Sequence, residues 1–311
     1  MNRRKFFNSP QAFMAQLGII TIITLAATAT LAADKQEVFS KPEEAVDALI
    51  NANRSNSVAE LLKILGPQAE KLINSGDAAA DKESRAKFLS AYNAAHKLES
   101  ETDDKQILIV GEKEWPLPIP LVRENGKWRF DTAAGAEEIL NRRIGRNELN
   151  VIEICRAFVE AEREYAATHI LAAGRGEYAQ RFLSNKGKQN GLYWPVDAGE
   201  EESPLGPLLA FAEAAGNNIK ARPYHGYYYK ILTGQSKEAR GGAINYISGG
   251  HMVNGFALIA FPARYGDSGI MTFIVNQNGI VHEKDLGPDT AKIVPKIKLY
   301  NPDKSWKLPS E

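Results

Sequence analysis

Cysteine is nearly absent from this sequence, which has one, Cys155, among 311 residues. A single thiol excludes a disulfide within the chain, and it excludes a zinc site built from several thiolates. An excess of charge is absent as well, because 38 basic side chains balance 38 acidic ones. Nucleic-acid binding usually needs a basic face or stripe. We therefore expect no nucleic acid among the partners.

The sequence also lacks the short motifs that mark common catalytic and cofactor sites. It contains no Gly-x-Ser-x-Gly elbow, no phosphate loop ending in Gly-Lys-Ser/Thr, no dinucleotide fingerprint and no His-Glu-x-x-His motif. No two histidines stand one helical turn apart, as a pair of metal ligands on a helix face would. The histidines are His96, His169, His225, His251 and His282. We expect no metal and no cofactor, and the sequence names no catalytic residue.

A long apolar run occurs once, near the N-terminus. Residues 17–31 are apolar or small, residues 3–5 are Arg, Arg and Lys, and no acidic residue precedes Asp34. A basic start, a short apolar core and small residues at the exit follow the order of a secretory signal. The core is short for a membrane span, which needs roughly 20 apolar residues. We predict a signal peptide over residues 1–33, a periplasmic or secreted mature protein, and no stable membrane span after cleavage.

Two export routes stay open for this signal. Arg3 and Arg4 ahead of Phe6 and Phe7 resemble the twin-arginine signal, but paired basic residues also begin ordinary Sec signals. Either route removes three basic side chains and leaves 35 against 38 acidic ones. The mature chain is therefore slightly acidic, which strengthens the argument against nucleic acid.

Residues 34–145 show a pattern of helices followed by strands. The predicted helices are one that opens at Pro42 with Ser40 as its cap, one around residues 61–65 and one near residues 84–98. A β-branched run at 106–110 predicts a strand, and alternate prolines make 115–121 an edge strand or an extended segment. Asn125-Gly126 then predicts the turn of a hairpin over 121–130.

The end of this hairpin carries a resemblance to known domains. Gly126-Lys127-Trp128-Arg129-Phe130-Asp131 is similar to the last hairpin of many exported members of the nuclear-transport-factor-two-like (NTF2-like) superfamily. Residues 34–145 therefore resemble its cone-shaped, helix-then-sheet domains. The resemblance implies a pocket between helices and sheet, but a pocket alone does not establish a function.

Two helices are predicted next, with Gly145 between them as a hinge or a tight turn. The first covers 133–143 and the second 147–167. On the second, apolar side chains recur at steps of three and four. They are Val151, Ile154, Cys155, Phe158, Ala161 and Tyr165. Arg156 and Glu160 are predicted to form an i,i+4 pair on another face. Cys155 is thus predicted to be a buried hydrophobe, because a nucleophilic thiol needs an exposed, electropositive setting.

The remaining residues, 146–311, resemble the globular part of type IV pilins and pseudopilins. A long helix, a loop rich in glycine and an antiparallel meander occur there in the pilin order. The predicted strands begin near Tyr224 and Gly255, and a hairpin joins 270–275 to 279–282. True pilins differ, since their mature chain opens with an apolar half-helix that packs in the filament.

Nearly the whole mature chain resembles one family, the exported bacterial family of domain of unknown function 2950. The most specific part of the match is the run RYGDSGIMTFIVNQ at 264–277, followed by Gly279 and by KDLG at 284–287. The resemblance implies kinship and carries no activity. No catalytic residue can be transferred from it.

A cluster of aromatic residues is the candidate partner-binding site. It consists of Tyr224, His225, Tyr227, Tyr228 and Tyr229. On a strand, Tyr227 and Tyr229 face one side and Tyr228 the other. One face is predicted to fill the core and the other to present tyrosine, which is enriched at interfaces, to a partner or a glycan.

The sequence thus predicts an exported α+β protein in which a helix-plus-sheet cone precedes a pilin-like domain. The leading functional hypothesis is a non-catalytic binding or accessory module for an envelope protein or a surface polymer. One alternative is a hydrolase of peptidoglycan or glycan, with carboxylates such as Glu177, Glu200 or Asp267 near His225. Another alternative is a structural accessory of a pilus.

The place of Cys155 on the apolar stripe yields a first prediction. Cys155→Ala should lower the free energy of unfolding modestly and leave any biological activity intact, because the thiol only packs. Chemical denaturation and an activity assay of the same preparation measure both effects. Loss of activity in a folded variant would overturn the structural interpretation of this residue.

Overall fold

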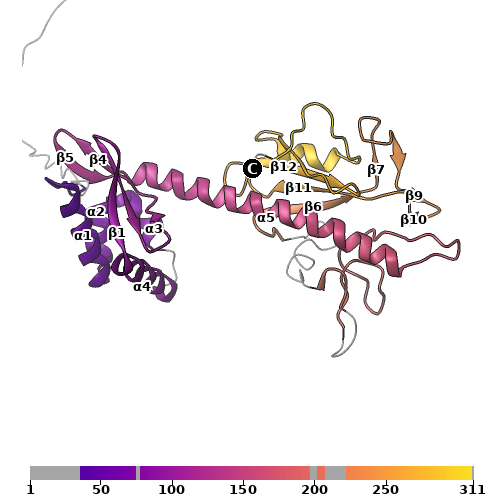
Figure 1. Cartoon of the computed structure of the whole chain (residues 1–311), viewed down its shortest axis with the longest axis horizontal. Helices are drawn as coiled ribbons and strands as arrows, with labels where there is room; N and C mark the ends of the chain where they lie inside the picture. Colours follow the sequence, from indigo (N-terminus) through magenta and orange to yellow (C-terminus); the bar gives the residue numbers. More distant parts are fainter. Residues whose placement is uncertain (1–35, 75–77, 197–201, 207–221, 310–311) are drawn as a thin grey trace, which may run out of the picture. The chain divides into compact units, whose positions relative to one another are not determined.

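The computed structural model describes residues 36–74, 78–196, 202–206 and 222–309 (Figure 1). The predicted signal peptide, residues 1–33, lies outside this range. The described residues form α-helices and antiparallel sheets, so the predicted α+β class is confirmed. Within the same residues, none of the helices combines the length and the apolar composition that crossing a membrane requires.

Helices come before strands in the first part of the chain, as predicted. The helices are α1 (Pro42–Arg54), α2 (Val58–Leu65), the 3₁₀ turn η1 (Pro67–Ala69), α3 (Glu70–Ile73) and α4 (Ala78–Ala94). The strands are β1 (His96–Thr102), β2 (Lys105–Val110), β3 (Trp115–Pro116), β4 (Leu121–Glu124) and β5 (Lys127–Phe130). The sheet runs in the order β1-β2-β4-β5, and β3 pairs with β2. Helices and sheet share one hydrophobic core.

The hairpin between β4 and β5 has the predicted turn. Asn125 and Gly126 both adopt positive φ, at 51° and 75°, as a type I′ turn requires. Trp128 and Phe130 are both buried in the core of the helix-plus-sheet region, which confirms that they share a face.

Two details of the predicted helices are wrong. Lys41, not Ser40, is the N-cap of α1, and it makes no side-chain cap. Instead, the Glu44 carboxylate accepts the Ser40 amide at 3.1 Å. The third helix ends at Ala94 rather than continuing to 98, because residues from His96 onward pair with β2. Tyr92 and His96, which the helical spacing placed on one face, are nevertheless in contact, because their rings stack with centroids 3.8 Å apart.

One continuous helix, α5 (Thr132–Thr168), replaces the two helices predicted around Gly145. Gly145 lies inside this 37-residue helix and is neither a hinge nor a turn. The helix starts at the Asp131 cap, whose carboxylate accepts the Ala134 amide at 3.2 Å. Glycine lowers helix stability without preventing a helix, which is why the sequence suggested a break that is absent.

The second half of α5 covers an antiparallel sheet. The main sheet has the order β13-β12-β11-β6, formed by β6 (Tyr227–Leu232), β11 (Ala257–Pro262), β12 (Met271–Asn276) and β13 (His282–Asp285). Short pairs join β7 (Gly234–Gln235) to β8 (Ile244–Asn245) and β9 (Ile247–Ser248) to β10 (His251–Met252). The chain then forms α7 (Thr290–Ile293) and η3 (Val294–Lys296). Helix α5 packs on β11 and β12 (Figure 1).

The predicted apolar stripe of α5 is confirmed, since all six of its side chains are buried in the second core. The predicted pair of Arg156 and Glu160 is wrong. Arg156 pairs with Glu153 at 2.5 Å, and Glu160 pairs with Arg163 at 2.7 Å. Both real pairs have i,i+3 spacing, which is equally accessible on a helix surface.

Polar contacts fasten the strand β12 to α5. One Glu148 carboxylate oxygen accepts the amides of Ile270 and Met271 at 2.8 and 2.9 Å, and the hydroxyl of Tyr227 at 3.3 Å. The side-chain amide of Asn147 donates to the Ser268 carbonyl at 2.9 Å. The sequence motif at 264–277 is therefore held to the helix by hydrogen bonds at residues 268–271, just before and at the start of β12.

Two glycines of α5 give a matched pair of predictions. A Cβ on Gly145 would meet open space, whereas a Cβ on Gly135 would lie 2.5 Å from Ile119 Cγ1. Gly145→Ala should raise the free energy of unfolding by about 1 kcal/mol, and Gly135→Ala should lower it by about 1–3 kcal/mol through overpacking. Urea denaturation followed by circular dichroism measures both. A Gly145→Ala variant less stable than the parent protein would contradict a continuous helix.

Candidate functional site

A cleft of about 670 Å³ opens between the helices and the sheet of the first region. We call it the apolar cleft. Its lining comes from α1 to α4 and from the segment 115–119. The apolar members include Leu49, Leu61, Leu65, Leu72, Phe88, Ala91, Leu117 and Ile119. A hollow of this size and composition is of the kind that receives apolar ligands or side chains.

Polar side chains stand at the edge of the apolar cleft, and two of them are already engaged. Arg85 donates to Asn56 Oδ1 at 2.6 Å and to the Ile73 carbonyl at 3.2 Å. Asn53 donates to the Leu49 carbonyl at 2.7 Å. The Arg85 bonds connect α4 to the turn after α1 and to the end of α3, and the Asn53 bond lies within α1. Asp81, Ser84 and Lys87 also line the cleft.

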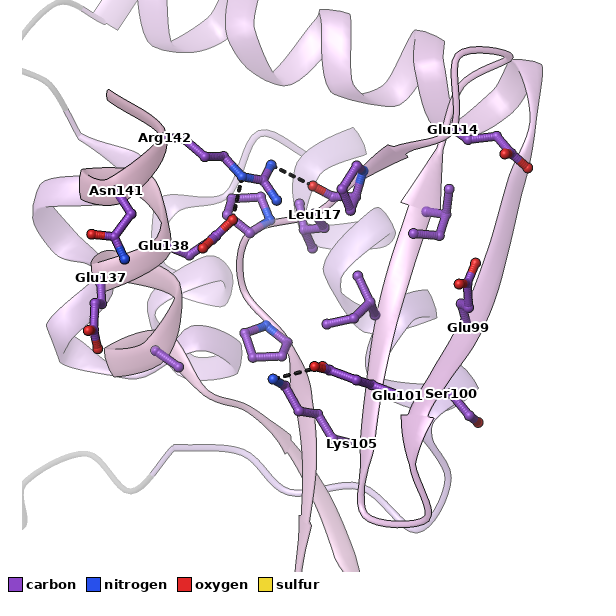
Figure 2. Close-up of a pocket in the computed structure, with 16 residues that line it drawn as sticks. Glu99, Ser100, Glu101, Lys105, Glu114, Leu117, Glu137, Glu138, Asn141 and Arg142 are labelled. Atoms are coloured by element: carbon purple, nitrogen blue, oxygen red, sulfur yellow. Dashed lines mark hydrogen bonds and ion pairs between the residues drawn. The ribbon is translucent and has the colours of Figure 1, made fainter. Parts of the chain in front are cut away.

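A second hollow, of about 730 Å³, shares Leu117 and Pro118 with the lining of the apolar cleft (Figure 2). We call it the acidic groove. Ile107, Ile109 and three prolines, Pro116, Pro118 and Pro120, contribute apolar surface to it. Figure 2 shows Glu99, Glu101 and Glu114 on the side of the strands, and Glu137, Glu138 and Asn141 on the side of α5. Five carboxylates and two basic groups line this groove.

Arg142 ties α5 to the proline segment at the end of the acidic groove. Its guanidinium donates to Glu138 at 2.7 Å and to the Pro116 carbonyl at 2.8 Å. It also lies 5.5 Å from the ring centroid of Trp115, within cation–π range. A fixed guanidinium between two walls keeps the shape of the groove defined.

One carboxylate of the acidic groove, Glu114, is engaged in an ion pair. Lys97 lies 2.8 Å from Glu114, and their hydrogen bond and charge interaction lower the pKa of that carboxyl. A general acid at neutral pH needs a raised pKa instead. Glu114 therefore lacks the raised pKa of a general acid, and its charge is already paired with Lys97.

The predicted aromatic site is divided by the fold. Tyr227 and Tyr229 are buried, at 0% and 6% exposure, and so are not accessible to a partner. This corrects the part of the predicted site that included them. Burial raises the pKa of both hydroxyls well above the ordinary range. Tyr224 and Tyr228 are half-buried and His225 is exposed, so these three remain a predicted surface.

His225 and Gly226 form a two-residue turn rather than part of a strand. Both have positive φ, 47° and 75°, and Tyr224 and Tyr227 exchange backbone hydrogen bonds across them. This is the geometry of a type I′ hairpin. The His225 ring contacts Asn150 of α5 at 3.1 Å. The unusual backbone of His225 is thus explained by the turn.

Of the carboxylates predicted near His225, Glu177 does not lie there, whereas Asp267 precedes Ser268, which packs against Gly226 beside His225. Glu177 pairs with His251 at 3.0 Å, and its amide donates to the His169 carbonyl beyond the end of α5. Since His225 contacts Asn150, the two places are roughly 28 Å apart along the helix. Asp267 pairs with Arg143 and Arg264. Glu200 lies outside the described residues.

Glu162 is a buried carboxyl that the sequence pattern did not reveal. It is fully buried in α5, and one oxygen accepts the Ala179 amide at 2.8 Å. Its other oxygen, Oε1, has no hydrogen-bond partner among the described residues. Burial raises its pKa well above the ordinary value of 4.5, partly offset by the Ala179 bond. The thiol of Cys155 is also fully buried, as predicted, and burial raises its pKa to about 12.

No group of three His, Cys, Asp or Glu side chains within the described ranges is arranged to hold a metal ion. The sequence did not reveal which residues line the apolar cleft and the acidic groove. A signal for the acidic groove was present, because Pro116, Pro118 and Pro120 alternate with the core residues Leu117 and Ile119. That pattern predicts an extended segment with two different faces.

Comparison with protein families gives one match. The model of a family described as Protein of unknown function (DUF2950) matches residues 36–308. The chain belongs to this family. No curated protein and no solved structure matches it. The region shared with the DUF2950 family contains the apolar cleft, the acidic groove and the motif at 264–277.

The buried carboxyl of Glu162 generates a pH-dependent prediction. Because its pKa is raised in the folded state, it favours folding below about pH 4.5 and loses that contribution as the pH rises through the folded-state pKa. The substitution Glu162→Gln replaces the ionisable carboxyl with a neutral amide and so removes this pH-dependent loss of stability. The variant should match the parent protein most closely near pH 4 and gain about 1–3 kcal/mol relative to it by neutral pH.

Urea denaturation at several pH values measures this difference. Glu164→Gln, on an exposed position of the same helix, is the control and should show no such trend. A constant difference between Glu162→Gln and the parent protein across the pH range would contradict the prediction.

Proposed function

We propose that this DUF2950 protein is an exported envelope protein that binds a partner protein or a surface component without chemical turnover. Its apolar cleft receives an apolar group of that partner. The observation that carries the proposal is the composition of the cleft, whose lining is mainly leucine, isoleucine, phenylalanine and alanine side chains. Apolar surface that stays open to solvent costs free energy until something covers it.

The half-exposed Trp115 supports the same proposal. Its side chain lines the apolar cleft, and 47% of its surface is exposed. Tryptophan is enriched at the centres of interfaces because it buries a large area with few rotatable bonds. The contact with Arg142 already limits the motion of this ring. A partner would therefore meet a surface ordered in advance, which lowers the entropic cost of binding.

The sequence resemblances supply the rest of the proposal. The order of residues 1–33 supports export, the NTF2-like resemblance suits a domain with a pocket between helices and sheet, and the pilin-like resemblance suits an envelope location. The surface formed by Tyr224, His225 and Tyr228 is proposed as a further contact for the same partner. These suggestions stand on the sequence.

Obstruction of the apolar cleft tests the proposal. Ser84 is an exposed residue of α4 that lines the cleft, and Ser90 is an exposed residue of the same helix that does not. Ser84→Trp should weaken binding of the apolar dye anilinonaphthalene sulfonate at least about fivefold, because the indole fills the opening. Ser90→Trp should bind it as the parent protein does. Equal binding by all three proteins would contradict a role for the cleft.

The biological partner is tested with the same variants. The tagged mature protein, isolated from an envelope fraction after crosslinking, should retain a component that Ser90→Trp also retains and Ser84→Trp loses. A protein recovered alone, with measurable turnover of peptidoglycan or glycan, would instead support the hydrolase alternative. That result would overturn the non-catalytic proposal.

A further inference from the structure

We propose that the acidic groove binds an extended, basic peptide segment of a partner protein. The proposal does not depend on the apolar cleft, because the two hollows have Leu117 and Pro118 in common but otherwise differ in their lining residues and in their chemistry. It rests on three features of the groove: the balance of its charges, the nature of its floor and the placement of its carboxylates on two facing walls.

The groove carries more negative than positive charge. Its lining contains five carboxylates, whereas only Lys105 and Arg142 are basic. Both basic groups are already paired, Lys105 with Glu101 at 2.7 Å and Arg142 with Glu138 at 2.7 Å. Lys97 adds one positive charge near Glu114 and Glu99, at 2.8 and 3.5 Å. Even with Lys97 counted, negative charge remains in excess.

Glu137 is the carboxylate best placed to attract a cation. It is exposed on the first turns of α5 and lines the groove. In the described part of the chain it makes no ion pair. Its charge is therefore not neutralised by a neighbour, and a ligand can approach it without breaking an existing bond. Complementary charge of this kind sets the sign of the ligand and speeds its association.

The floor of the groove explains why the ligand is a peptide rather than a hydrated ion. Ile107 and Ile109 of β2 and the rings of Pro116, Pro118 and Pro120 present apolar surface. Lysine and arginine side chains bury their methylene stems on such a surface while their charged ends reach carboxylates. A small hydrated cation gains nothing from that floor. The fixed φ of the prolines also limits the flexibility of this floor.

The two walls explain why the bound segment is extended. Glu99 and Glu101 lie on one side and Glu137 on the other (Figure 2). The register of β1 shifts between Ser100 and Thr102, and both Ser100 and Glu101 line the groove. Register shifts of the β-bulge kind re-aim side chains beside binding sites. Successive side chains of an extended chain point in opposite directions, so neighbouring basic residues would reach both walls.

A labelled peptide tests this inference. The probe is fluorescein-labelled Gly-Ser-Arg-Lys-Arg-Lys-Ser-Gly, and the control peptide carries Glu-Asp-Glu-Asp at the four central positions. Fluorescence anisotropy with the mature protein should show binding of the basic peptide only. The affinity should fall from low salt to about 0.15 M salt, because exposed charges are screened.

Two charge reversals on α5 distinguish the groove from general attraction by an acidic protein. Glu137→Lys changes a groove carboxylate, and Glu164→Lys changes an exposed carboxylate outside the groove by the same charge. Glu137→Lys should weaken peptide binding about fivefold or more, and Glu164→Lys should leave it within about twofold. Circular dichroism and thermal melting should show both variants folded as the parent protein is.

Several outcomes would overturn the proposal. These are equal weakening by both variants, equal binding of the acidic control peptide, and no binding by the parent protein at millimolar peptide. Hydrogen exchange gives the location, since the basic peptide should protect backbone amides within residues 97–109 and 134–142. Protection confined to other residues would also overturn it. Ser84→Trp should bind the basic peptide normally, so a failure at the apolar cleft and a failure at the acidic groove are distinguishable.

Discussion

The unbroken backbone of α5 is the constraint on which the other features depend. Its first turns pack Gly135 on Ile119, and Thr132 donates to the Leu65 carbonyl at 2.5 Å. Its later turns cover β11 and β12 and present Glu148 to the amides of Ile270 and Met271. Each helical residue rises 1.5 Å and turns by 100°. The helix therefore sets the positions along its axis and around it at which Thr132, Gly135 and Glu148 meet these partners.

The segment from Trp115 to Pro120 gives the first region two binding surfaces from one short stretch of chain. Leu117 and Pro118 line both hollows. An extended backbone sends alternate side chains to opposite sides, and proline prevents the stretch from rearranging into a helix. Trp115 faces the apolar cleft, while Pro116 and Pro120 face the acidic groove. The same short segment therefore contributes to the lining of an apolar cleft and of a charged groove.

Two buried polar groups of the second region differ in how fully their hydrogen-bonding capacity is satisfied. The one proton of the Tyr227 hydroxyl is shared between the Met271 carbonyl at 3.0 Å and Glu148 at 3.3 Å, so this group has hydrogen-bond partners in its apolar surroundings. Glu162 satisfies only one of its carboxylate oxygens, which makes it the less favourable of the two at neutral pH. The difference lies in partners supplied by other strands and loops. Residue type alone does not determine it.

The sequence by itself determined the α+β class, the hairpin at Asn125-Gly126, the apolar stripe of α5 and the kinship with the DUF2950 family. These depend on local periodicity, turn chemistry and a recognisable run of residues. Tertiary structure decided the rest. It joined two predicted helices through Gly145 and placed Glu177 beside His251 rather than near His225. It also buried Tyr227 and Tyr229 and formed the apolar cleft and the acidic groove. Each of these outcomes depends on contacts between residues far apart in the chain, and no local pattern encodes such contacts.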